Sequence, residues 1–175
     1  SKSSEKNKWK LTDSLKEKIV EQAKKDAQDN VYMGNAFMNL RKMEVSKVAP
    51  NRAALIGKFN QSMNSGNMSA MKEVEKADKK WLCILFGIPY EAEFQGEGTG
   101  SAAHVYNECG EEVLTYTEGV GWQEKETKAE SQVHSALKST YYEAFCDARK
   151  ALNSEQRTGG MNENIMSQGN FDMKA

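Results

Sequence analysis

The stretch that decides the fold class is SAAHVYNECGEEVLTYTEGVGWQEK, residues 101–125. Two runs in it, 102–106 and 112–117, carry the valine, threonine and tyrosine residues typical of strands, and the segment between them contains a glycine suited to a turn. A third short run follows at 121–125. This pattern predicts a small antiparallel β-meander, which is a hairpin plus a third short strand.

The length of the hairpin loop decides which side chains share a face, because side chains alternate along a strand. A loop of four residues brings together one apolar set: Ala103, Val105, Leu114 and Tyr116. A loop of three residues brings together a different set: His104, Tyr106, Leu114 and Tyr116. We favour the longer loop, since it gives the cleaner apolar face.

Directly after the meander, the sequence predicts one long helix at 128–152, with Thr127 as its N-cap and Glu130 at capping-box spacing. Apolar residues recur on one side of it over its whole length: Ala129, Val133, Leu137, Tyr141, Ala144, Phe145, Ala148 and Leu152. We expect this stripe to pack on the apolar face of the meander, because both surfaces need a cover. Residues 153–175 lack such a pattern and are expected to form a mobile tail.

The N-terminal part of the chain, 11–88, is predicted to be helical. Helices are expected at about 13–28, 35–48, 51–63 and 69–86. The apolar run 81–86 could be a buried strand instead, because periodicity does not separate the two at that length. The polar residues 1–10 are expected to be a flexible lead-in. The chain is thus predicted to be an α+β protein with a single domain at 11–152, made of a helical part, the meander and the long helix.

The formal net charge of −1 conceals a split between the two halves of the chain. Residues 1–88 carry 17 Lys and Arg against 10 Asp and Glu, or +7, whereas residues 89–175 carry 7 against 15, or −8. The two halves could attract each other within the fold, which is the plainer interpretation. Alternatively, they could offer a basic face to an acidic partner and an acidic face to a basic one. A nucleic-acid partner is disfavoured, because the whole chain has no basic excess.

Several patterns that carry chemistry in other proteins are incomplete here. The glycine-rich stretch 96–100 resembles a phosphate-binding loop, but no Lys or Arg lies between residues 81 and 124 and a predicted strand follows it. The two histidines, His104 and His134, and the three cysteines lack the close ligand pairs of a zinc site. The sequence therefore predicts no metal site and no cofactor, and it identifies no catalytic residue.

The candidate binding residues are one histidine and three aromatic residues of the meander: His104, Tyr106, Tyr116 and Trp122. On exposed strands the three aromatic rings could form a platform for a sugar, a peptide or a single-stranded base. Alternatively, they belong to the core of the sheet beneath a helix, which we favour. Methionine raises a similar choice: six of the nine Met residues lie within 33–71, where they either line an adaptable groove for a partner helix or, as we favour, fill gaps in a helical core.

These observations predict a non-enzymatic protein-interaction or structural module, with a protein partner or a second copy bound through the oppositely charged halves. The alternative is a small-molecule binder or hydrolase that uses a cleft between the hairpin and the helical half, with His104, Glu112 or Tyr116 inside it. No apolar run is long enough for a transmembrane helix, so no membrane partner is expected. The odd number of cysteines favours a reducing compartment such as the cytoplasm. The overall character of the sequence suggests a bacterial domain.

Overall fold

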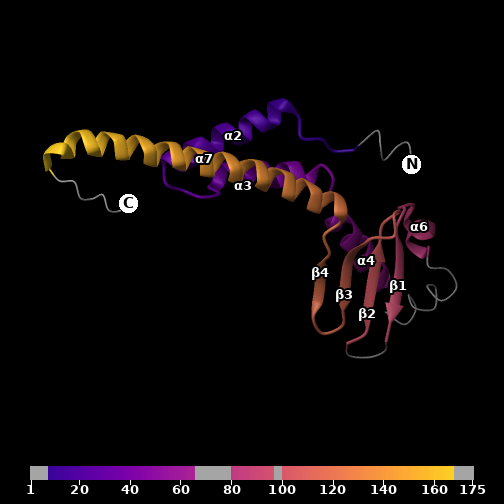
Figure 1. The fold of residues 1–175 in the computed structure, drawn as a ribbon. Coiled ribbons are helices and arrows are strands. Elements are labelled where there is room, and N and C mark those ends of the chain that lie inside the picture. Colours follow the sequence, from indigo (N-terminus) through magenta and orange to yellow (C-terminus); the bar gives the residue numbers. More distant parts are fainter. Residues whose placement is uncertain (1–7, 66–79, 97–99, 168–175) are drawn as a thin grey trace. The chain divides into compact units, whose positions relative to one another are not determined.

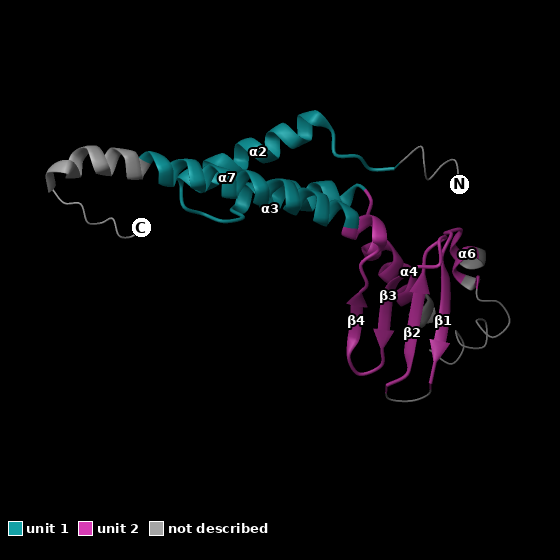
Figure 2. Cartoon of the chain, viewed as in Figure 1, with its two compact units in different colours: residues 1–47, 132–175 teal, residues 48–131 magenta. Residues whose placement is uncertain are grey.

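The computed structural model of the chain describes residues 8–65, 80–96 and 100–167 (Figure 1). Helices occupy the N-terminal half, strands the middle and a long helix the C-terminal part, which confirms the predicted α+β class. The chain divides into two compact units (Figure 2). Unit 1 consists of residues 1–47 and 132–175, and unit 2 of residues 48–131.

Unit 1 begins with helix α2 (Asp13–Gln28), whose bounds confirm the prediction. The hydroxyl of Thr12 accepts a hydrogen bond of 3.1 Å from the backbone N–H of Leu15 and so caps the helix. The apolar stripe of α2 is buried: Leu15, Ile19, Ala23 and Ala27. Helix α3 (Asn35–Ser46) follows and ends two residues before the predicted bound, because Lys47 already forms its C-cap.

The long C-terminal helix α7 runs from Lys128 to Ser167. It begins where predicted but continues past Leu152, so the first part of the expected tail is helical, and residues 168–175 lie outside the described residues. This continuation is possible because no proline interrupts the segment, although it contains two glycines. In unit 1 the stripe of α7 is buried at Val133, Leu137 and Tyr141, and the Tyr141 ring stacks on that of Phe37 in α3 with centroids 4.1 Å apart.

Unit 2 contains a four-stranded antiparallel sheet in the order β1-β2-β3-β4. Its strands are β1 (Glu91–Gln95), β2 (Ala102–Tyr106), β3 (Glu112–Thr117) and β4 (Gly121–Glu124). The predicted hairpin strands are confirmed, the third strand ends one residue early, and β1 was not predicted. Glu91 and Glu93 alternate with Ala92 and Phe94 in β1, so the strand has one acidic and one apolar face.

The helices of unit 2 are α4 (Arg52–Ser65) and α6 (Trp81–Phe86). The segment 81–86 is therefore a helix, and its alternative interpretation as a strand was wrong. The preceding part of the helix predicted at 69–86 falls mostly in 66–79, outside the described residues.

The register of the hairpin confirms the grouping expected from the longer loop, since Ala103 pairs with Tyr116 and Val105 with Leu114. This face of the sheet forms the core of unit 2 together with residues of α4 and α6: Leu55, Phe59, Leu82, Ala92, Ala103, Val105, Val113 and Leu114. The prediction that the long helix covers this face was wrong. Leu55 and Phe59 stand one helical turn apart on α4 and provide the cover instead, while the stripe of α7 is buried within unit 1.

A buried ion pair joins the elements of unit 2. The Arg52 guanidinium donates to both carboxylate oxygens of Glu130 at 2.7 and 2.8 Å, and to the carbonyls of Val113 and Lys125 at 2.9 and 2.7 Å. Glu130 also accepts from the backbone N–H of Thr127 at 2.8 Å, and the Thr127 hydroxyl accepts from the Glu130 N–H at 3.1 Å, so the predicted capping box is confirmed. Burial raises the pKa of Glu130, but the hydrogen bonds from Arg52 and Thr127 bring it below its ordinary value overall.

Candidate functional site

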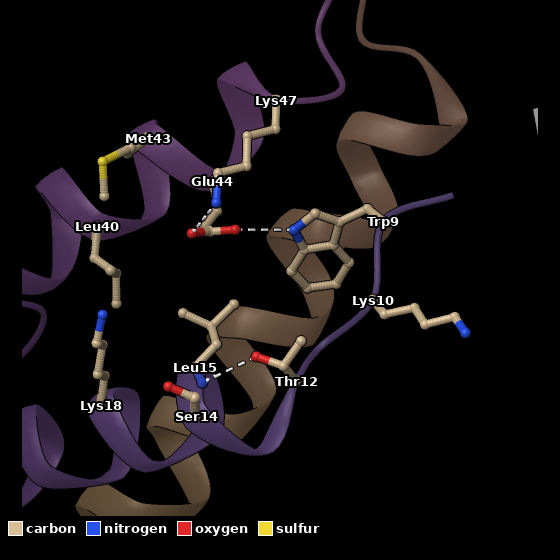
Figure 3. Close-up of a pocket in the computed structure, with 10 residues that line it drawn as sticks. All are labelled: Trp9, Lys10, Thr12, Ser14, Leu15, Lys18, Leu40, Met43, Glu44 and Lys47. Atoms are coloured by element: carbon tan, nitrogen blue, oxygen red, sulfur yellow. Dashed lines mark hydrogen bonds and ion pairs between the residues drawn. The ribbon is translucent and has the colours of Figure 1, made fainter. Parts of the chain in front are cut away.

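A pocket of about 330 Å³ lies in unit 1, between the first turns of α2 and the C-terminal part of α3 (Figure 3). We call it the α2–α3 pocket. Its lining residues come from these two helices and the segment before α2: Trp9, Lys10, Thr12, Ser14, Leu15, Lys18, Leu40, Met43, Glu44 and Lys47. The volume is at the lower end of the range for ligand-binding pockets, about 300–1,000 Å³.

Short-range features of the sequence build the walls of this pocket. The Thr12 cap fixes where α2 begins, and this start turns Leu15 toward α3. The residues before the cap place the indole of Trp9 next to α3. There the indole Nε1–H donates to Glu44 Oε1 at 3.0 Å. Figure 3 shows Leu40 and Met43 projecting from α3 on the opposite side of the pocket. The lining is therefore mixed, with apolar side chains set among hydroxyl and charged ones.

Among the residues that the structure describes, Glu44 is the only carboxylate that lines the pocket. It is buried, with 6% of its surface exposed, and it accepts a hydrogen bond of 2.8 Å from Lys47 as well as the one from Trp9. Burial alone raises the pKa of Glu44, but these two donors and the charges of Lys47 and Lys18 bring it below its ordinary value. Glu44 is consequently ionised at neutral pH, and its charge is already balanced within the protein.

The two other cations of the pocket, Lys10 and Lys18, form no ion pair with any residue that the structure describes. Figure 3 shows Lys18 extending along the pocket toward Leu40, whereas Lys10 extends outward beside Trp9. The described lining thus contains three lysines and one carboxylate, with Lys18 directed along the pocket and Lys10 away from it. This arrangement suits a ligand with an apolar body and a negative group.

The four candidate binding residues of the meander lie on opposite faces of the sheet. His104 and Tyr106 belong to the face away from the core, with ring centroids 6.5 Å apart. Tyr116 and Trp122 pack against the core, where Trp122 meets Phe59 at 5.0 Å and Tyr116 at 5.1 Å. The structure therefore brings them together as two separate pairs rather than as one platform.

On the face away from the core, His104 forms a cross-strand polar cluster. Its Nδ1 lies 2.5 Å from Glu112 Oε2 and its Nε2 lies 3.1 Å from Gln95 Oε1. The hydroxyl of buried Thr115 donates to the same Glu112 oxygen. Burial raises the pKa of Glu112, whereas the hydrogen bonds from Thr115 and His104 lower it below its ordinary value overall. Both ring nitrogens have partners, so this cluster ties β1, β2 and β3 together.

The residues of the hydrolase alternative are likewise divided, because His104 and Glu112 share one face while Tyr116 lies on the other. Within the described ranges, no three His, Cys, Asp or Glu side chains are grouped closely enough to hold a metal ion. In the same part of the chain, every helix is too short or too polar to cross a membrane.

Sequence reasoning missed the α2–α3 pocket. Lys18 and Glu44 occupy ordinary positions in helical patterns, and only the pairing of α2 with α3 brings them near each other. The one available signal was Trp9, a large aromatic residue in an otherwise polar and lysine-rich segment. Comparisons with protein-family models, with curated proteins and with solved structures give no match to this chain.

Proposed function

We propose that this protein is a non-enzymatic interaction module, and that its α2–α3 pocket binds an apolar side chain carried on an acidic segment of a partner protein. One observation carries the proposal. The pocket places apolar side chains beside Lys18, with Lys10 extending outward at its edge. Glu44, the single carboxylate among the described lining residues, already accepts hydrogen bonds from Lys47 and Trp9.

The apolar contact supplies most of the expected affinity. Burying one Val, Leu or Phe side chain contributes about 1.5–3 kcal/mol. Such a side chain would contact the apolar residues of the lining, among them Leu15, Leu40 and Met43. The flexible side chain of methionine can adapt its shape to different partners.

The lysines add specificity and faster association more than affinity. An exposed ion pair contributes about 0.2–1 kcal/mol and weakens as salt is added. Acidic segments are therefore preferred over neutral ones by a modest factor, and basic segments are rejected.

The described residues of the pocket also lack the arrangement that nucleophilic catalysis needs. Its hydroxyls belong to Thr12 and Ser14, and the Thr12 oxygen already accepts the capping hydrogen bond. The carboxylate of Glu44 is held by two donors, so it is poorly placed to remove a proton from either hydroxyl. These contacts favour a binding role for the pocket.

The proposal is tested with a short acidic peptide that contains one leucine, compared with the same peptide in which serine replaces the leucine. Calorimetry should detect binding of the first peptide and a loss of about tenfold or more for the second. Lys18→Glu should weaken binding of the leucine peptide about threefold to tenfold, because it places a carboxylate beside the bound acid.

Lys24→Glu is the matched control, because Lys24 is exposed on the same helix and does not line the pocket. It should change the affinity less than twofold. Equal effects of the two charge reversals, or equal binding of the leucine and serine peptides, would refute the proposed site.

A further inference from the structure

We infer that a second copy of this chain supplies the segment that the pocket binds, through its turn between β3 and β4. This inference rests on the proposed function of the α2–α3 pocket and names its partner. The pocket calls for an apolar side chain close to a carboxylate, and the turn at 118–121 has both.

The turn presents Val120, which is 71% exposed and is the most exposed large apolar side chain among the described residues. A single exposed valine is ordinary on a protein surface. Its neighbourhood makes it a candidate for docking, because Glu118 stands two positions before it and is only partly buried. An apolar side chain and a carboxylate thus lie on one short turn.

The backbone of this turn is fixed. Gly119 and Gly121 adopt φ values of 89° and 107°, which other residues rarely take, and the Val120 N–H donates to the Thr117 carbonyl at 2.9 Å. The Glu118 N–H donates to the Ser101 carbonyl at 2.8 Å. Because the turn is already ordered, docking it costs less conformational entropy than docking a flexible peptide.

The charges of the two surfaces are complementary. Residues 89–131, which include the whole sheet, contain ten Asp and Glu against two Lys. The pocket offers Lys10 and Lys18 without ion pairs to described residues. A turn that enters the pocket therefore brings an acidic surface toward unpaired lysines, which favours association at low salt.

The turn belongs to unit 2 and the pocket to unit 1, so each copy carries one of each. Such a contact is heterologous, with each copy using its turn on one neighbour and its pocket on another. The expected product is a head-to-tail chain or closed ring that grows with concentration and dissociates as salt is added.

The first experiment is light scattering after size exclusion, with the full chain loaded from about 10 µM to about 1 mM, the range in which weak contacts become populated. The wild-type mass should rise with concentration and fall toward the monomer in high salt. Val120→Ser should remain monomeric over this range, whereas Lys18→Glu should need about threefold to tenfold higher concentration than the wild type to self-associate, as in the peptide titration. Val31→Ser replaces another exposed valine, in unit 1, and should self-associate like the wild type.

The second experiment mixes the two variants at a concentration at which each alone is monomeric and the wild type self-associates. Val120→Ser retains its pocket and Lys18→Glu retains its turn, so the mixture should form a capped one-to-one dimer and nothing larger. A mixture that stays monomeric, or a wild type that stays monomeric over the whole range, overturns the inference. In that case the leucine-peptide titration still decides the proposed function separately, because it needs no second copy.

Discussion

Two glutamates with the same exposure have different surroundings in the two units. Glu44 in unit 1 and Glu130 in unit 2 are each 6% exposed, and the pKa of each lies below the ordinary value because neighbouring donors outweigh burial. Glu130 is held by the planar guanidinium of Arg52, whose side chain is only 10% exposed. Glu44 is held by Lys47, whose side chain is 58% exposed, and by Trp9 from the segment before α2.

This difference separates a structural carboxylate from one beside a binding site. Arg52 satisfies Glu130 with two hydrogen bonds in a fixed plane, and the same guanidinium reaches two backbone carbonyls. Lys47 offers a single contact on a long side chain, and the pocket beside Glu44 is left open to a ligand. Equal burial alone therefore does not identify which carboxylate serves binding.

The largest expected effect comes from removing the partner of Glu130. Arg52→Met should lower the free energy of unfolding of unit 2 by about 3–5 kcal/mol, because it leaves a buried carboxylate without its cation. Urea denaturation followed by hydrogen exchange in β3 would measure this loss. A cost below about 1 kcal/mol would mean that the ion pair is not what joins these elements.

The second-largest effect is expected in the pH dependence of the free energy of unfolding, which should differ between variants of the two glutamates. Since the pKa of Glu130 is lower in the folded than in the unfolded chain, the unfolded chain binds more protons at acid pH, and stability falls as the pH decreases below about 4.5. The stabilising contribution is fully present above that value. Glu130→Gln should reduce the change in the free energy of unfolding of unit 2 with pH below about 4.5. Glu44→Gln should reduce the corresponding change for unit 1, but to a smaller extent. Identical slopes in both variants and the wild type would contradict the assigned pKa directions.

Trp9→Phe should have a smaller effect, because it keeps most of the packing and removes only the hydrogen bond to Glu44. The expected loss of stability of unit 1 is about 1 kcal/mol. Thermal unfolding measured against the wild type would detect it as a lower midpoint. No change in midpoint would mean that the indole contributes no net stability through Glu44.

The smallest effect is expected for Lys47→Ala. Because this lysine is largely exposed, its ion pair with Glu44 should contribute only about 0.2–1 kcal/mol, and less in high salt. The same denaturation experiment at two salt concentrations measures it. A loss as large as that of Arg52→Met would remove the distinction between the two glutamates.

Much of the local structure follows from sequence patterns. The helix at 13–28 is predicted by its stripe and by the Thr12 cap, and the hairpin is predicted by alternation and its turn. These features depend on neighbours within a few residues, which is where propensity and periodicity are informative.

The features that were missed depend on contacts between distant segments. The strand β1 was overlooked because Glu91 and Glu93 belong to its polar face, which becomes visible as such only once it pairs with β2. The cover of the sheet was assigned to α7 because its long apolar stripe needed a partner surface, whereas the structure uses Leu55 and Phe59 of α4. The pocket needs Trp9 and Glu44, 35 residues apart, to meet.

The central claim is that the α2–α3 pocket binds an apolar side chain on an acidic segment. Its most direct test is the NMR signal of the Trp9 indole N–H, assigned with the Trp9→Phe variant, during titration with the acidic leucine peptide. The account predicts that this signal shifts to saturation, that the Trp122 indole signal stays in place, and that Lys18→Glu weakens the response. A Trp9 signal that does not move at saturating peptide, or a larger shift at Trp122, would contradict it.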